Sequence, residues 1–230
     1  MQLSIIIPIL NEGDQALLCV RQLAPLRAAG HELILVDGGS DRLAGDALIP
    51  WVDQLLSCEA GRARQMNLGA RMARGEVFWF LHADTRLMGD AAEAICRALA
   101  GGPAWGRFDI QLDGPHPLLR LVERTMNGRS RWSGIATGDQ GIFIQRDLFF
   151  RVGGFPDQAL MEDIEISARL KRLCRPVCLR QRLLTSSRRW ERQGILRTIF
   201  LMWGLRLAYW FGVNPRRLAE KYKSCPTPPS

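Results

Sequence analysis

The most constraining feature of the sequence is an apolar run at residues 77–81 (VFWFL), which stops abruptly at His82-Ala83-Asp84. A run rich in aromatic and branched side chains is typical of a strand buried on both faces of a sheet. In an open parallel sheet, ligands bind beyond the carboxyl ends of the strands. Residues i and i+2 of an extended chain point the same way. We therefore expect His82 and Asp84 to converge at the lip of a crevice, where they could bind a metal ion.

Short strands alternate with helices through the first half of the chain. We expect strands at residues 3–8, 32–37, 51–57 and 77–81, and helices at residues 14–29 and 62–74. This alternation predicts an α/β fold with a mostly parallel central sheet flanked by helices, whose right-handed crossovers bring the strand ends to one edge. That edge would collect the polar residues that follow the first, second and fourth strands: Asn11, Glu12, Asp37, Ser40, Asp41, His82 and Asp84.

The second half of the chain is less regular. Glu162 and Asp163 fall in the first turn of an expected helix, where the helix dipole favours carboxylates even when they do no chemistry. We expect residues 1–190 to form one domain. Its second half would contain helices at residues 90–100, 117–131 and 162–173, a half-exposed strand at 105–112, a strand at 142–145 and a glycine-rich loop at 152–156.

Residues 195–213 are the most apolar segment, but Arg197 and Arg206 interrupt it. Each arginine at the centre of a bilayer would cost about 2.5–3.5 kcal/mol, so a membrane-spanning helix is not expected. Residues 191–223 are instead predicted to form an amphipathic helical segment that packs on the domain or on a membrane surface. The pattern leaves both open, and the aromatic residues and basic neighbours fit the second. The tail at residues 224–230 is expected to be disordered.

Composition narrows the class of partner and the compartment. The chain has 230 residues and a net charge of +8, which favours an acidic partner such as a phosphorylated small molecule or an anionic membrane. Nucleic acid is not expected, because most aromatic residues lie in runs that read as buried. The six cysteines form no CxxC pair, and the amino terminus does not resemble a signal peptide. We therefore expect reduced thiols and a cytoplasmic protein, which could be peripheral to the inner membrane.

Four motifs at the predicted sheet edge resemble glycosyltransferase family 2, a group of enzymes with the GT-A fold. The resemblance covers residues 2–190. The motifs are Ile7-Pro8 with Asn11-Glu12, VDGGSD at residues 36–41, Leu81-His82-Ala83-Asp84 where the family keeps Asp-x-Asp, and Gly153-Gly154-Phe155 ahead of Glu162-Asp163. The His-Ala-Asp sequence, GRARQMN at residues 61–67 and Ser187-Arg188-Arg189-Trp190 resemble a bacterial subgroup of this family.

The resemblance implies an inverting hexosyltransferase that moves a sugar from a UDP- or GDP-linked donor to an acceptor hydroxyl, on a molecule that could be lipid-linked. Asp163 would act as the general base, and Glu162 would position the acceptor or a neighbouring side chain. Asp84 would bind Mn²⁺ or Mg²⁺, which prefer oxygen ligands. His82 would be a second metal ligand or would hydrogen-bond a phosphate or ribose hydroxyl instead. The implied contacts with the nucleotide sugar are Pro8, Asn11, Glu12, Asp37, Gly39, Ser40, Arg62, Gln65, His82, Ala83, Asp84, Gly154, Arg188, Arg189 and Trp190.

Other classes fit the residues less well. Taken alone, Asp37 and Asp41 are explained by turn formation, because Asp and Gly dominate tight turns. A sugar-phosphate nucleotidyltransferase would need a glycine-rich basic loop after the first strand, and residues 8–13 have neither feature. A methyltransferase would need a third glycine near Gly38-Gly39, which is also missing. A non-catalytic nucleotide-binding protein remains an alternative.

Overall fold

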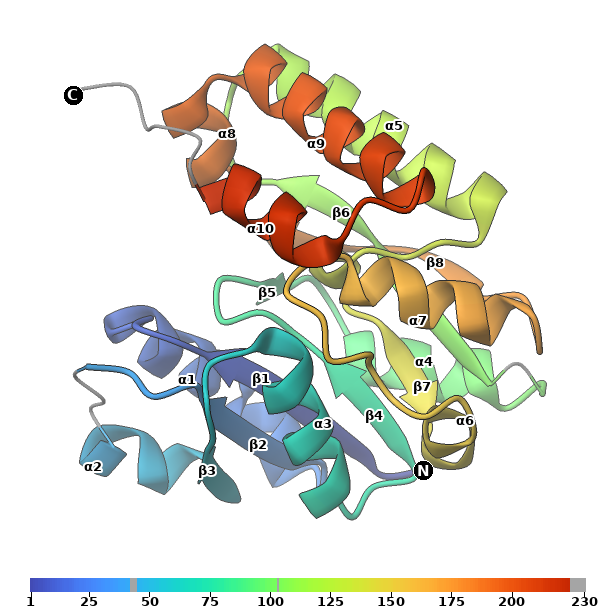
Figure 1. The fold of residues 1–230 in the computed structure, drawn as a ribbon. Helices are drawn as coiled ribbons and strands as arrows, with labels where there is room; N and C mark the ends of the chain where they lie inside the picture. Colours follow the sequence, from blue (N-terminus) through green and yellow to red (C-terminus); the bar gives the residue numbers. More distant parts are fainter. Residues whose placement is uncertain (42–44, 103, 224–230) are drawn as a thin grey trace.

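The computed structural model describes residues 1–41, 45–102 and 104–223. Within these residues, eight strands form one sheet in the order β3-β2-β1-β4-β7-β6-β8-β5, with helices on both faces (Figure 1). The predicted disordered tail at residues 224–230 lies outside the described residues. The mixed sheet flanked by helices is the architecture that the strand and helix alternation predicts.

The first half of the chain forms the parallel part of the sheet. Its strands are β1 (Leu3–Ile9), β2 (Glu32–Asp37), β3 (Gln54–Ser57) and β4 (Val77–Phe80). Its helices are α1 (Asp14–Ala28), α2 (Gly45–Leu48) and α3 (Arg62–Met72). The third strand begins at Gln54 rather than at residue 51, because Ile49–Trp51 form a short 3-10 helix with Pro50 in its first turn. Proline has no N–H to give to a strand ladder.

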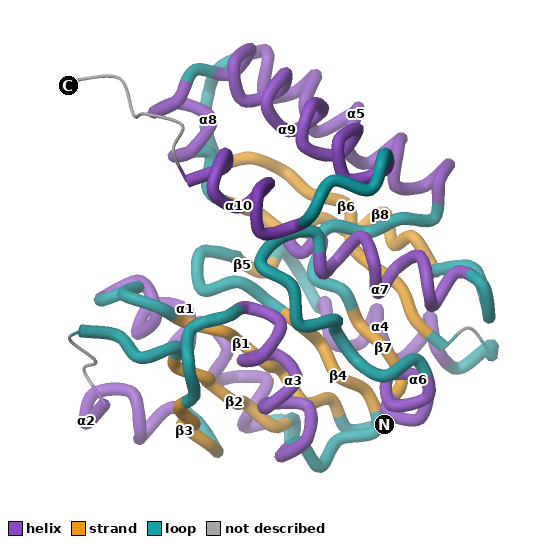
Figure 2. Tube along the Cα trace, in the orientation of Figure 1, coloured by secondary structure: helices purple, strands orange, loops and turns teal. Residues whose placement is uncertain are grey.

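The second half extends the sheet with antiparallel pairs. Its strands are β5 (Arg86–Leu87), β6 (Trp105–Leu112), β7 (Phe143–Gln145) and β8 (Val177–Thr185). Strand β7 runs antiparallel to both β4 and β6, whereas β6 and β8 are parallel. The helices are α4 (Ala91–Leu99), α5 (Pro117–Ser133), α6 (Arg146–Arg151) and α7 (Glu162–Lys171). Figure 2 shows the loops that join these elements.

Alternating side chains of the central strands build two apolar layers. Ile5 and Ile7 of β1 pack on the face covered by α1 and α4. Ile6 packs on the other face, with α3, α6 and α7. This period of two is what an extended strand gives. It fixes the register of β1 firmly, since a slip by one residue would exchange the two faces.

Strand β6 corrects one expectation. The sequence predicts that it is half-exposed, but its side chains are almost all buried. Arg107 is 0% exposed. Its guanidinium pairs with Asp109 and donates to the carbonyl oxygens of Phe108 and Asn127. Charges that would ordinarily face water are therefore satisfied inside the protein, beneath α5.

The chain ends in three helices: α8 (Arg188–Gln193), α9 (Ile195–Trp210) and α10 (Pro215–Lys223). Helix α9 runs alongside α5 (Figure 1), where Ile195 and Ile199 pack on the apolar face of α5. Leu205 packs with Met161 and Leu218. The domain boundary expected after residue 190 falls inside α8, so the division into a domain and a separate segment stays a prediction. In the described part of the chain, no helix has the length and apolar character to cross a membrane.

Candidate functional site

A cleft of about 360 Å³ opens where the carboxyl end of β4 meets the second half of the chain. His82 and Asp84 line it from the end of β4, and Glu162 and Asp163 line it from the start of α7. Helices α5 and α9 form its opposite wall. The sequence predicts this convergence of His82, Asp84 and the distant Glu162-Asp163 pair, and the structure brings all four residues together.

The loops after β1 and β2 are tied together by hydrogen bonds beside this cleft. Asn11 has a positive φ of 55°, and its backbone N–H donates to Ser40 Oγ at 2.8 Å. In return, the Asp41 N–H donates to Asn11 Oδ1 at 2.9 Å. The Asp37 carboxylate accepts from the backbone N–H groups of Gly39 and Ser40 and from Ser40 Oγ. Asp37 thus holds its own turn, and its predicted contact with a nucleobase stays a prediction.

Gln65 lies beneath these loops and supports them. Its side chain is 3% exposed, and its Nε2 donates to the carbonyl oxygens of Ile9 and Val36 at 2.8 Å each. A Cβ at Gly38 would lie 3.2 Å from the same amide. Gln65 therefore joins the ends of β1 and β2, with both amide hydrogens already used. Its expected direct contact with the nucleotide stays a prediction that the burial does not favour.

Arg62, at the start of α3, links the two sides of the cleft. Its Nε lies 3.6 Å from Glu162 Oε1, and its Nη2 lies 3.4 Å from His82 Nδ1. Because a guanidinium can only donate, this contact assigns Nδ1 the acceptor role and places the hydrogen of the neutral ring on Nε2. Burial, followed by the charge of Arg62, lowers the pKa of His82 well below its ordinary value, so the ring stays neutral at physiological pH.

His82 Nε2 is buried and has no hydrogen-bond partner among the residues that the structure describes. With the hydrogen on this nitrogen, His82 is suited to donate to an anionic oxygen such as that of a phosphate. A metal ion needs a free lone pair instead. Of the two roles that the sequence leaves open for His82, the contact with Arg62 favours the hydrogen bond over metal ligation.

Three carboxylates from different parts of the chain, Glu12, Asp84 and Asp139, lie close enough for their charges to shift the pKa values of Asp84 and Glu12. Burial raises the pKa of Asp84, the neighbouring charge of Asp139 raises it further, and Arg188 and Arg62 oppose the rise. Burial and the charge of Asp84 likewise raise the pKa of Glu12. Carboxylates that repel each other favour a bound proton or cation.

Asp84 and Asp139 therefore fit a hard divalent cation, which prefers oxygen ligands. Among residues 1–41, 45–102 and 104–223, no group of three His, Cys, Asp or Glu side chains could hold a metal ion. A cation here would need oxygen atoms from a ligand, such as a diphosphate, to complete its coordination.

The Glu162-Asp163 pair is presented by a strained backbone. Met161, immediately before α7, has a φ of 68°, a conformation that costs an ordinary residue energy and is common at functional sites. Asp163 accepts hydrogen bonds from the backbone N–H groups of Gly138 and Ile164 at 2.8 Å each. Glu162 is 4% exposed, and burial raises the pKa of its carboxyl, against the charge of Arg62. Asp163 thus has a fixed orientation and lone pairs that remain for a ligand.

Residues 4–155 of the chain match the family model described as Glycosyl transferase family 2. The chain belongs to this family. It is also similar to two Mycobacterium tuberculosis proteins, "Uncharacterized glycosyltransferase MT1564" of strain CDC 1551 / Oshkosh and "Uncharacterized glycosyltransferase Rv1514c" of strain ATCC 25618 / H37Rv. Each is 29% identical over 192 residues, which cover 74% of this chain and 69% of the relative.

Solved structures share the fold of this family 2 glycosyltransferase. The structure of S. aureus TarS 1-349 in complex with UDP-GlcNAc matches 81% of this chain with a TM-score of 0.67 and 14% identity, and the match spans 58% of that chain. The longer TarS structure gives a TM-score of 0.65, and there the match spans 37% of the chain. The expected GT-A fold is confirmed. The family also sets aside the nucleotidyltransferase and methyltransferase alternatives, whereas the bacterial subgroup stays a prediction.

Asp139 is a cleft residue of this glycosyltransferase that sequence reasoning missed. It follows Gly138, whose backbone is packed so closely that a Cβ there would lie 2.1 Å from Arg62 Nη2 and 3.0 Å from His82 Nε2. The signal in the sequence is Gly138-Asp139-Gln140-Gly141 directly before β7. That segment is distant from the other motifs along the chain, and only β7 pairing with β4 brings it to the site.

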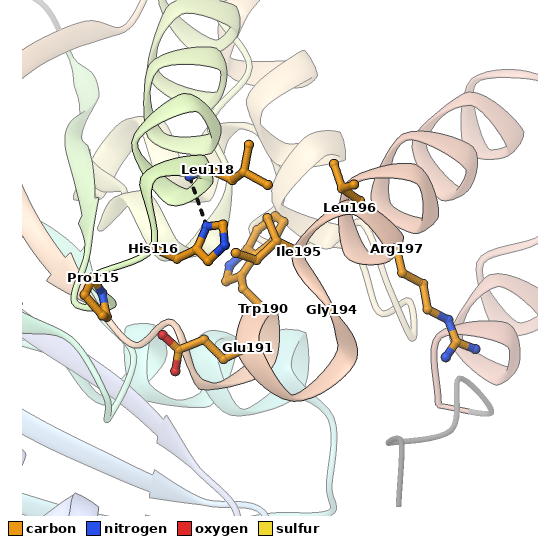
Figure 3. Close-up of a pocket in the computed structure, with 9 residues that line it drawn as sticks. All are labelled: Pro115, His116, Leu118, Trp190, Glu191, Gly194, Ile195, Leu196 and Arg197. Carbon is orange, nitrogen blue, oxygen red and sulfur yellow. Dashed lines mark hydrogen bonds between the residues drawn. The ribbon is translucent and has the colours of Figure 1, made fainter.

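The remaining residues predicted to contact the nucleotide sugar lie in different parts of the structure. Trp190 and the backbone of Arg189 belong to α8, where Trp190 lines both the cleft and an outer hollow of about 680 Å³ (Figure 3). A Cβ at Gly154 would lie only 2.7 Å from Asn67 Oδ1. Close packing against the Asn67 side chain therefore explains the glycine at this position. The donor contacts expected of Pro8, Gly39, Ala83, Gly154, Arg188, Arg189 and Trp190 stay predictions.

Proposed function

We propose that this glycosyltransferase transfers a hexose from a UDP- or GDP-linked donor to an acceptor hydroxyl, with inversion at the anomeric carbon. The observation that carries the proposal is that Arg62, Asp84 and Asp163 line one cleft. TarS, which shares the fold, has been solved with UDP-GlcNAc and with UDP. That supports a nucleotide-sugar donor and names neither the sugar nor the base here.

The proposed reaction is a direct displacement. The acceptor oxygen forms a bond to the anomeric carbon while the bond from that carbon to the diphosphate oxygen breaks. The hydroxyl proton passes to Asp163, whose carboxylate is oriented by the N–H groups of Gly138 and Ile164. A base placed within reach of the attacking hydroxyl contributes about 10²–10⁴-fold to such a step.

The departing diphosphate carries additional negative charge that the protein must stabilise. Arg62 and Arg188 supply positive charge beside Asp84, and His82 offers the N–H on Nε2. Mn²⁺ or Mg²⁺ would be held by Asp84 and Asp139, and would neutralise charge on the diphosphate. The loops after β1 and β2, with Asn11, Asp37 and Ser40, would receive the nucleoside.

We further propose that α9 contacts an anionic membrane surface, which would make the enzyme cytoplasmic and peripheral and would suit a lipid-linked acceptor. One side of α9 packs on the protein, and the other exposes large apolar side chains. Phe200 is 75% exposed and Trp210 is 78% exposed. Leu196, Phe200, Trp203, Leu207 and Trp210 recur at helical spacing, and exposed arginines follow at Arg216 and Arg217. Aromatic residues beside arginines are the pattern of interfacial helices.

The donor proposal is tested by calorimetric titration of UDP, GDP, ADP and UDP- and GDP-linked hexoses, with Mn²⁺ or with a chelator. One uridine or guanine nucleotide is expected to bind at least tenfold more tightly than ADP and to weaken when the metal is removed. Asp84→Asn should reproduce the effect of the chelator. Asp147→Asn, an exposed carboxylate in the first turn of α6, should leave binding unchanged. Failure of every nucleotide to bind would refute the donor and leave a different use of the cleft.

A further inference from the structure

Helices α5 and α9 form the far wall of the cleft, and each has an arginine on the helix face that carries its cleft-lining residues. On α5, Val122, Thr125 and Met126 line the cleft, and Arg129 follows at positions i+4 and i+3 from the last two. Residues at these spacings share one face of a helix. On α9, Ile199, Met202 and Arg206 line the cleft at the same kind of spacing. Arg129 and Arg206 therefore approach each other from adjacent helices.

Both side chains have guanidinium nitrogen atoms that are buried and make no hydrogen bond among the described residues. These atoms are Nε and Nη2 of Arg129 and Nε of Arg206. Two other arginines of α5 form ion pairs, Arg120 with Glu123 and Arg131 with Asp109. A buried N–H that loses water without gaining an acceptor costs about 1–3 kcal/mol. Two neighbouring arginines with such unpartnered N–H groups are suited to bind an anion.

Electrostatic interactions connect Arg129 to Arg206 and to the carboxylates of the cleft. Burial, and then the charge of Arg206, lower the pKa of Arg129 to about 10, while Asp139 and Asp163 oppose the shift. Asp84 instead senses Arg188 and Arg62. Arg206 thus lines the cleft, and the charge of Arg129 acts on two carboxylates of the cleft, Asp139 and the proposed base Asp163.

We propose that Arg129 and Arg206 bind a phosphate group on the acceptor, so that this enzyme glycosylates a phosphate-bearing molecule. The proposal rests on the proposed function, because it assigns the acceptor side of that cleft. Planar guanidinium groups match phosphate oxygens well and hold them by charge-assisted hydrogen bonds. The same wall carries the apolar side chains of Val122, Met126 and Met202, which suits a phosphate ester with an apolar neighbour.

The test measures binding of inorganic phosphate by calorimetry to the full chain, with and without saturating UDP or GDP. Arg129→Gln and Arg206→Gln should each weaken phosphate binding by about ten- to a hundredfold, the value of losing a hydrogen bond to a charged group. Arg124→Gln is the matched control, because Arg124 is exposed on α5 and should bind phosphate like the wild type. Arg129→Lys should restore part of the loss.

Stability separates binding from a structural role. Without ligand, the Arg129→Gln variant should melt no lower than the wild type, since an unpartnered buried charge contributes no stability. A lower melting temperature together with unchanged phosphate binding would overturn the proposal. So would equal weakening by Arg124→Gln, which would indicate attraction to net charge alone. If both glutamine variants lose nucleotide binding and keep phosphate binding, the pair belongs to the donor and the acceptor assignment is wrong.

The same experiment also distinguishes the donor proposal from the phosphate-subsite proposal. Two further probes distinguish a lipid phosphate from a soluble phosphate ester. If no nucleotide binds but phosphate binding still depends on Arg129 and Arg206, the donor proposal fails and the anion subsite stands. Octyl phosphate and glycerol 3-phosphate are then compared as probes. At least tenfold tighter binding of octyl phosphate identifies a lipid phosphate, and equal binding identifies a soluble phosphate ester. Failure of both, with or without nucleotide, overturns the subsite.

Discussion

The two sides of the cleft differ in how completely their polar groups are hydrogen-bonded within the protein. On the loop side, Asn11, Asp37 and Ser40 complete their hydrogen bonds with one another. On the helix side, Arg129 and Arg206 keep buried nitrogen atoms that have no partner in the described residues. A side whose polar groups are already satisfied presents a fixed shape to its ligand, and fixed dipoles cost no reorganisation during reaction.

The difference indicates how the two ligands would be selected. The loop side can receive a nucleotide largely by shape and by the few lone pairs that remain. The helix side has an energetic need for an anion, so it would reject acceptors that leave its arginines unpaired. The proposed catalytic groups lie on the border between the two, where β4 ends and α7 begins. Changes on each side should therefore disturb different steps.

The largest expected effect comes from Asp163→Asn, on the border. Transfer should fall by about 10²–10⁴-fold, because an amide in place of the Asp163 carboxylate cannot act as the proposed base, while the affinity for the donor nucleotide should change little. The readout is the rate of release of nucleoside diphosphate, set beside calorimetric binding of the nucleotide. Asp147→Asn in the first turn of α6 is the control. Equal loss of nucleotide binding and rate would remove Asp163 from the base role.

A smaller effect is expected from Gly138→Ala, which acts across the same border. The new Cβ would lie 2.1 Å from Arg62 Nη2, so Arg62 must leave its place between His82 and Glu162. Nucleotide affinity should weaken about tenfold, which corresponds to about 1.4 kcal/mol of binding free energy. A Cβ at Gly128 on α5 would meet no described atom within 4 Å beyond its chain neighbours and the nearby backbone of its own helix. Gly128→Ala should therefore stabilise the protein, by about 0.5–1 kcal/mol, as alanine replaces glycine in a helix. Unaltered nucleotide affinity in Gly138→Ala would show that Arg62 does not hold the donor.

Substitutions on the outer face of α9 should weaken membrane binding without altering the cleft. Replacing both Phe200 and Trp210 by serine removes two large apolar side chains that are 75% and 78% exposed. Binding to vesicles with anionic lipid should weaken about tenfold or more, since burying one such side chain is worth about 1.5–3 kcal/mol. Flotation of the protein with vesicles measures this. Ile49→Ser, which changes a 57% exposed residue near α2, is the control. If the wild type ignores anionic lipid, the exposed face has another use.

The smallest expected effect is a gain in stability from Asp84→Asn. The pKa of Asp84 is raised above 3.8, mainly by burial, so the ionised carboxylate destabilises the fold at neutral pH and the penalty disappears as the pH falls below the ordinary value. The variant should melt about 1–3 °C higher than the wild type at pH 7.5, and the difference should shrink toward zero as the pH falls below 3.8. Scans of thermal unfolding across this range decide it. A lower melting temperature at pH 7.5 would contradict the sign.

The sequence predicts the loop side better than the helix side for a physical reason. Strands β1, β2 and β4 are short apolar runs that end in turn residues, and their parallel pairing brings Asn11, Asp37 and Asp84 to one edge almost automatically. Strand β8 was not foreseen, because its residues VCLRQRLLT alternate too weakly between apolar and polar. The half-exposed pattern of β6 misleads, because the charge of Arg107 is neutralised within the core.

By itself, the sequence determined the parallel half of the sheet, the family, and the carboxylates that meet at the cleft, because these follow from local periodicity and from strand ends that share an edge. Only the tertiary structure decided that Gln65 is a support, that His82 Nδ1 faces Arg62, and that Asp139 and Arg206 line the cleft. Those facts depend on burial and on which charges meet across elements far apart in the chain. A residue's partners in space are set by packing, which its neighbours in sequence do not encode.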